Sequence, residues 1–177
     1  ARDVDVSGHK FTQKENQGEI LRDLREYMVV GGFPEVVVKG LDHRTYLSTL
    51  FDSVVLKDVV RRHNVRFSSR IYDLARYLMD MYSSELSFTR AKNVLGLGSV
   101  HTVENYTKYL VEAFPFFLIN RFSFKAKDQL TLPKKVYSID VGLVNALSLR
   151  TTENRGKIME NLVAIDLLRL SLIHISE

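Results

Sequence analysis

Three polar residues, His101, Asn105 and Lys108, recur at intervals of three or four positions. This spacing places their side chains on one face of a helix, where an Asn amide can bond an adenine edge and a Lys can contact a phosphate. Glu104 and Glu112 belong to the same helix and would repel phosphates, and this helix contains no arginine. The pattern therefore predicts contacts to duplex DNA but argues against strong sequence recognition.

Lysines gather in the segment that follows this helix, at Lys125, Lys127, Lys134 and Lys135. Residues 87–138 contain eight Lys and Arg against three Asp and Glu, a local charge of +5 in a chain whose total is +4. An excess concentrated in one module favours a surface that meets a phosphate backbone. The same lysines would also suit an exposed hairpin that binds nothing, because charged edges prevent strands from pairing between molecules.

Two helices joined by a glycine turn, and two extended runs after them, would position these side chains. Ser87 and Ser99 can cap the helices, because a serine hydroxyl accepts an otherwise unpaired N–H of the first turn. The second helix has an apolar face made of Val100, Val103, Thr107, Leu110, Val111 and Phe114. With a further helix from about Ser68, the order predicts a winged helix-turn-helix with a β-hairpin wing. The expected bounds are 87–95 and 99–114 for the two helices and 96–98 for the turn between them. The two extended runs are expected at 116–122 and 134–139.

The remaining pattern is also helical, so the sequence predicts a mostly α fold. Asn16 and Glu19 resemble a capping box at the start of a helix that ends at Gly31. Asp42 caps a long helix, and an apolar helix that begins at about Gly156 is expected to be buried. The first of these helices has an expected buried face made of Ile20, Leu21, Leu24, Tyr27 and Met28.

Composition narrows the possible classes of protein. The 177 residues are 45% hydrophobic and 26% charged, as in globular domains. No run of about 18 uncharged apolar residues predicts a membrane span. The absence of cysteine excludes disulfides and thiolate metal sites and fits the cytoplasm. The five histidines are scattered and no nucleophile motif occurs, so we expect no catalytic residue and no metal site in this chain.

Six short motifs follow one another between about residue 20 and residue 169. They are Gly31-Gly32-Phe33-Pro34-Glu35, Asp58-Val59-Val60-Arg61-Arg62, Thr102 with Tyr106 and Tyr109-Leu110, Pro133-Lys134-Lys135-Val136-Tyr137, Asp140-Val141-Gly142-Leu143, and Gly156 with Glu160-Asn161. In this order they resemble a prokaryotic family of AAA-type ATPases. In that family a P-loop core precedes a domain that combines a winged helix with a nuclease-like α/β fold.

The resemblance implies that the chain is a fragment of a longer ATPase that uses ATP and Mg. Its parts would be a remnant of the ATPase core and helical lid (1–40), a connecting helix (41–67), the winged helix-turn-helix (68–138), the truncated start of the nuclease-like domain (139–170) and a non-native tail (171–177). The tail resembles translated sequencing-adaptor sequence. No G-x-x-x-x-G-K-S/T phosphate loop occurs in the chain, so we do not expect it to hydrolyse ATP alone.

The resemblance also implies roles for single residues. Gly31, Gly32 and Pro34 would contact the adenine of ATP in the intact protein, although a helix C-cap followed by a rigid turn explains the same residues. Glu160 would match a metal-binding carboxylate of the nuclease-like fold, but one carboxylate cannot hold the ion by itself.

Two classes of partner follow from the residues and the resemblance. Double-stranded DNA is the expected partner of the winged helix. The alternative is docking on the parent's own ATPase core or on a second copy, for which Tyr106 and Tyr109 suit an interface. No membrane partner is expected.

Overall fold

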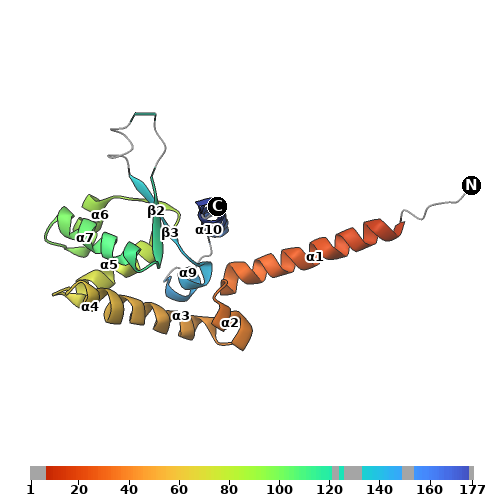
Figure 1. The fold of residues 1–177 in the computed structure, drawn as a ribbon, viewed down its shortest axis with the longest axis horizontal. Coiled ribbons are helices and arrows are strands. Elements are labelled where there is room, and N and C mark those ends of the chain that lie inside the picture. Colours follow the sequence, from red (N-terminus) through yellow and green to blue (C-terminus); the bar gives the residue numbers. More distant parts are fainter. Residues whose placement is uncertain (1–6, 121–123, 126–132, 149–153, 176–177) are drawn as a thin grey trace, which may run out of the picture.

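The computed structural model describes residues 7–120, 124, 125, 133–148 and 154–175, with side chains between 17 and 171. Within these residues the fold is mostly helical, as predicted, and contains one three-stranded antiparallel sheet. Figure 1 shows helices on both sides of this sheet and helix α1 projecting away from the other elements. No helix in the described part combines the length and the apolar character that crossing a membrane would require.

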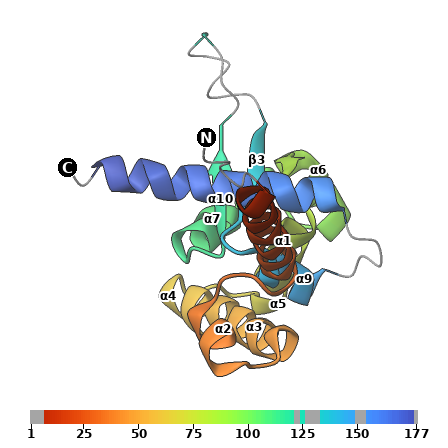
Figure 2. The same ribbon diagram turned by 90° about the vertical axis from the view of Figure 1, so that its right-hand side faces the viewer.

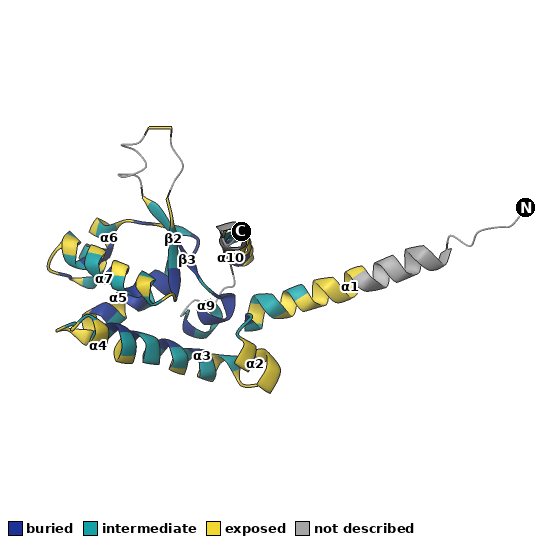
Figure 3. Cartoon of the chain, in the orientation of Figure 1, coloured by how far each residue is buried: buried dark blue, intermediate teal, exposed yellow. Residues whose placement is uncertain are grey.

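Helix α1 (Ser7–Val30) is longer than the sequence pattern indicated. The predicted start at Asn16 is wrong, because no proline precedes it and nothing prevents the helix from extending. The predicted burial of Ile20 and Leu21 is also wrong, since their exposed fractions are 65% and 52%. Figure 3 shows that this part of α1 lies outside the packed region. Gly31, with a φ of 81°, ends the helix as expected.

A short helix and a long helical rod follow. Helix α2 (Pro34–Lys39) begins with a proline at its first position, where the missing N–H costs nothing. The rod starts after Asp42 as predicted, because this carboxylate accepts the Thr45 N–H at 2.9 Å. Its three parts are α3 (His43–Asp52), the π-helix η1 (Ser53–Val59) and α4 (Val60–Arg62). Phe51 on the rod packs edge-on against Phe116, which joins the rod to the sheet.

Helices α5, α6 and α7 occur where the sequence predicted them. The elements of this region are α5 (Ser68–Asp80), strand β1 (Ser84–Leu86), α6 (Phe88–Leu95) and α7 (Val100–Glu112). Ser87 and Ser99 cap α6 and α7 as expected. The core between the helices contains Ile71, Leu74, Leu78, Val103 and Leu110. Phe114 was expected on the same face but is 76% exposed, because the chain turns there with a φ of 66°.

The sheet has the strand order β1-β3-β2, with every pair antiparallel. Strands β2 (Phe116–Ile119) and β3 (Lys134–Ser138) form the predicted hairpin. The sequence did not predict β1, because three residues are too few to show the alternation of a strand. Ser84 of β1 lies opposite Val136, and Leu118 of β2 lies on the other side of the same residue.

Two helices complete the fold. Helix α9 (Val141–Leu147) packs against α3 and the end of α1, and α10 (Arg155–Ile175) lies across the sheet on the side opposite α5–α7 (Figures 1 and 2). The buried apolar residues in the described part of α10 are Ile158, Leu162, Ala164 and Ile165, and Asn161 is buried beside them. The expected burial of Met159, Val163 and Leu167 is wrong, because these side chains point away from the sheet.

Candidate nucleic-acid interface

The structure brings His101, Asn105 and Lys108 together on the outer face of α7. The Asn105 amide lies 3.3 Å from the His101 Nε2, so the two side chains form a hydrogen-bonded pair one turn apart. The two glutamates of α7 accompany them: Glu104 lies 3.8 Å from His101, and Glu112 lies 3.9 Å from Lys108. The face therefore presents polar groups of both signs, so that any phosphate near it would be repelled as well as attracted.

The end of α4 borders this face. The His63 ring stacks on Tyr109 with centroids 3.9 Å apart, and its Nε2 lies 3.4 Å from Glu112. Tyr106 lies beside Tyr109, with ring centroids 6.4 Å apart. Both tyrosines are half-buried and pack against the core of the chain. Only part of each side chain is therefore accessible to a partner. The contact between His63 and Tyr109 could not be predicted from the sequence, because 46 positions separate the two residues.

The predicted lysines of the hairpin divide between the two faces of the sheet. Side chains alternate along a strand, so Lys134 shares the face of the buried Val136, whereas Lys135 points to the face covered by α10. Lys125 interacts with another group of the protein. Lys127 lies outside the described residues. The hairpin therefore keeps its predicted place, and the two lysines at its base have different surroundings.

Lys135 belongs to a polar cluster beneath α10. Its Nζ donates to Glu160 at 2.8 Å, and the Tyr137 hydroxyl donates to the same carboxylate oxygen at 2.9 Å. The hydrogen bond from Lys135 lowers the pKa of Glu160, with a smaller contribution from Tyr137. Burial, together with the neighbouring carboxylate, raises the pKa of Tyr137 to about 12. The cluster therefore consists of an ion pair and a neutral phenol at neutral pH.

A buried asparagine fixes α10 beside this cluster. The Asn161 amide accepts the Ser138 N–H and donates to the Ser138 carbonyl, with both distances 2.9 Å. These backbone groups face the side where β1 no longer pairs, so the amide substitutes for a neighbouring strand. Ser83 donates to the Lys157 carbonyl at 2.9 Å and joins α10 to the residues before β1.

The glycines of the predicted nucleotide contact pack against other parts of the chain. Gly32 donates its N–H to Asp140 at 2.7 Å, and a Cβ on Gly31 would lie 2.2 Å from the Asp140 Oδ1. A Cβ on Gly32 would lie 2.7 Å from the Tyr27 ring. Burial raises the pKa of Asp140, and N–H donors from Gly32 and the first turn of α9 partly offset this effect. Gly31 is therefore required for the close approach to the start of α9, whereas Gly32 packs against the Tyr27 ring.

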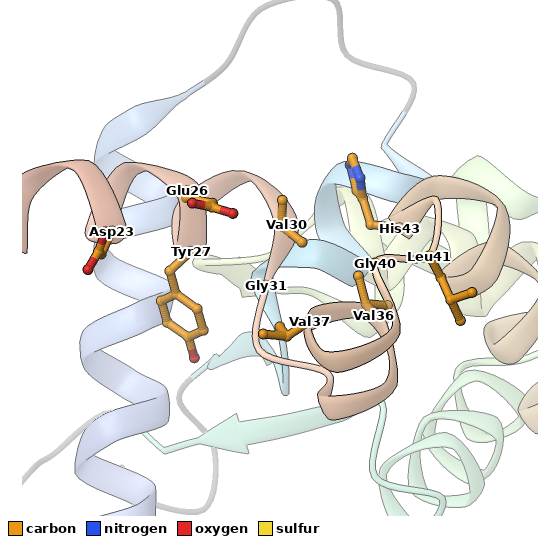
Figure 4. Close-up of a pocket in the computed structure, with 10 residues that line it drawn as sticks. All are labelled: Asp23, Glu26, Tyr27, Val30, Gly31, Val36, Val37, Gly40, Leu41 and His43. Atoms are coloured by element: carbon orange, nitrogen blue, oxygen red, sulfur yellow. The ribbon is translucent and has the colours of Figure 1, made fainter.

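A pocket of about 460 Å³ lies beside this turn (Figure 4). Tyr27 and apolar side chains line it together with the carboxylates of Asp23 and Glu26. The two carboxylates would repel a phosphate group at this place. Pro34 is the first residue of α2, and the adenine contact proposed for Gly31, Gly32 and Pro34 stays a prediction.

The described residues also bear on metal binding. Within them, no three His, Asp or Glu side chains come together as a metal ion would require. Glu160, the carboxylate singled out by the resemblance, bonds Lys135 and Tyr137. Its Oε1 therefore already accepts two hydrogen bonds within the chain.

The sequence of this chain is similar to those of two longer proteins. The chain is 33% identical over 160 residues to "Uncharacterized protein MJ1544" of Methanocaldococcus jannaschii, which covers 86% of this chain and 35% of that protein. It is 30% identical over 149 residues to an "Uncharacterized protein" of Haemophilus influenzae. This alignment covers 81% of the present chain and 37% of the relative. The chain thus spans about a third of the length of these relatives. No solved structure matches it significantly. A model of a family described as "Domain of unknown function (DUF8612)" matches residues 21–154, so the chain belongs to that family.

Proposed function

We propose that residues 68–138 form a winged helix that binds duplex DNA, as the C-terminal part of an AAA-type ATPase. The observation that carries this proposal is the order α5, β1, α6, α7, β2, β3 with β3 in the centre of the sheet. In a winged helix this order directs the second helix of the turn motif, here α7, to the major groove. The hairpin then lies along the flanking backbone.

The side chains of α7 indicate which kind of DNA binding to expect. Lys108 can meet a phosphate, and Asn105 can reach a base edge only by giving up its bond to His101. Glu104 and Glu112 lower the positive potential of the same face. We therefore propose weak, sequence-tolerant binding driven by phosphate contacts, with a Kd of about 10⁻⁴ to 10⁻⁶ M at physiological salt.

The proposed place in an ATPase rests on the six motifs and on length. The two relatives are long enough to contain a P-loop core in addition to the part that matches this chain. ATP and Mg would belong to that core, since this chain has no phosphate loop. The pocket beside Gly31 would take at most the adenine end of the nucleotide.

Binding to random-sequence duplex DNA at several salt concentrations tests the DNA proposal. The full chain is compared with Lys108→Ala and Lys134→Ala, and with Lys39→Ala on the distant helix α2 as a control of equal charge. Each lost phosphate contact should lower the slope of log K against log salt by about 0.9, and the control should leave it unchanged. Equal slopes in all four proteins would contradict binding through this module.

Protein docking is a second candidate function, favoured by apolar side chains on the outer face of α10. Met159, Val163, Leu167 and Leu170 follow one another at helical spacing and are exposed. A groove of about 340 Å³ between α1 and α10 includes Met159 in its lining.

Sedimentation of the full chain tests the docking candidate. Leu167→Glu should dissociate an assembly held by this face. Val94→Glu, at an exposed apolar position on α6, should preserve it. A wild-type monomer at all concentrations would exclude self-association.

A further inference from the structure

The base of the proposed DNA-binding hairpin is tied to α10 through one carboxylate. Lys135 and Tyr137 both point to the face of the sheet that α10 covers, and both donate to the Oε1 of Glu160. The other predicted lysine of the same strand, Lys134, points to the opposite face. Lys135 therefore differs from Lys134 in having a defined intramolecular anion as its partner.

This ion pair remains accessible to a competing anion. The side chains of Lys135 and Glu160 are 42% and 40% exposed, and pairs this exposed contribute little to stability. A hollow of about 170 Å³ lies beside Lys135 on this face of the sheet, with Glu85 and Tyr137 in its lining. Glu85 also lies opposite Lys135 in the register of β1 and β3. A phosphate that reached Lys135 would thus have to displace one carboxylate and approach a second.

The position of Glu160 is set by the packing of α10. Its neighbour Asn161 bonds both backbone groups of Ser138, and Lys157 contacts Ser84 at the start of β1. These contacts hold Glu160 over the hairpin in a fixed place. A shift of α10 along or away from the sheet would therefore separate Glu160 from Lys135.

We propose that Glu160 restrains DNA binding by holding Lys135 in an ion pair that a backbone phosphate must displace. The inference rests on the proposed function and adds a regulatory contact to it. In this arrangement α10 keeps the hairpin in a state of low affinity, and anything that moves α10 raises the affinity. Loss of the Glu160 carboxylate should have the same effect without any movement.

The test measures binding of the full chain to random-sequence duplex DNA as a function of salt. Glu160→Gln should bind about two- to fivefold more tightly than the wild type, the equivalent of one exposed ion pair. Its salt slope should be steeper by about 0.9, as expected for one added phosphate contact. Asp166→Asn is the matched control, because it removes the same charge from an exposed position on the same helix.

Two further variants separate the contact from net charge and from folding. Glu160→Asp keeps the charge but shortens the side chain, so it should also release Lys135 and raise the affinity. Lys135→Ala should cancel the gain when it is combined with Glu160→Gln. Circular dichroism spectra of the four variants, compared with the wild type, verify the fold.

The outcomes distinguish the inference from the proposed function. Equal gains for Glu160→Gln and Asp166→Asn, in proteins that bind DNA in a salt-dependent manner, would overturn the restraint and leave the DNA proposal intact. Absence of binding by the wild type and by Glu160→Gln at low salt would overturn both. A gain that is specific to Glu160 and requires Lys135 would support both.

Discussion

Asp140 accepts the backbone N–H of Gly32 at 2.7 Å, although 108 positions separate the two residues in the sequence. The other oxygen of the same carboxylate accepts the Gly142 N–H at 2.7 Å and caps α9. One side chain therefore joins the end of α1 to the start of α9. Asn145 strengthens this junction by donating to the Met28 and Val29 carbonyls at the end of α1.

The close approach at this junction gives the first prediction. A Cβ on Gly142 would lie 2.2 Å from the Val30 carbonyl oxygen, which is backbone and cannot rotate away. We expect Gly142→Ala to reduce the free energy of unfolding by about 1–3 kcal/mol, as overpacked sites do. Urea denaturation measures the change. Gly18→Ala is the control, since nothing lies within 4 Å of its Cβ, and it should show no loss.

The carboxylate itself gives the second prediction. Asp140→Asn keeps one acceptor oxygen and turns an NH₂ group toward N–H donors, so we expect a loss of about 1–3 kcal/mol in the free energy of unfolding. Asp42→Asn should cost only a few tenths of a kcal/mol, because asparagine caps a helix as well as aspartate does. Comparable losses in the two variants would contradict a special role for the contact between Asp140 and Gly32.

The local parts of this fold could be predicted from sequence because each signal is contained in a few residues. Asp42, Ser87 and Ser99 begin helices through their own side chains, and Gly31 and Gly96 end helices with positive φ. These features depend on neighbours within one turn. Apart from the start of α1, the predicted helices and the hairpin were therefore found close to their expected bounds.

Contacts between distant residues could not be predicted in this way. Strand β1 pairs with β3 about fifty positions later, and Lys135 meets Glu160 across an intervening helix. Neither contact leaves a periodic trace in the sequence. The same limit explains Phe114 and Ile20, whose apolar character indicated burial although no element covers them. The candidate face of α7 was predictable, whereas the surroundings of Lys135 were not.

The titration of Tyr137 gives a third prediction. Its pKa is raised from 10.0 to about 12 by burial and by the neighbouring Glu160. The folded state should therefore keep this phenol protonated between these values while the unfolded state loses the proton, so stability falls as pH rises through this range. The difference in tyrosinate absorbance between wild type and Tyr137→Phe should have its midpoint near 12. A midpoint near 10 would contradict the buried hydrogen bond.

The pairing of Glu160 with Lys135 gives a fourth prediction. The lowered pKa of Glu160 means that its ionised form stabilises the folded state above the ordinary value of 4.5. This contribution should be lost as pH falls through the lowered pKa of the folded state. Because the pair is exposed, we expect the free energies of unfolding of wild type and Glu160→Gln to differ by less than about 1 kcal/mol at neutral pH. This difference should shrink in acid. Urea unfolding across pH measures it, and a difference that grows in acid would contradict the pairing.

The proposed function requires duplex DNA to contact α7 and the hairpin. The most direct measurement is an NMR titration of the ¹⁵N-labelled full chain with random-sequence duplex DNA at low salt. We expect the amide shifts to concentrate in α7 and in the hairpin strands β2 and β3, and to disappear as salt is raised. Shifts confined to α1 and the outer face of α10, or no shifts at all, would contradict DNA binding through this module.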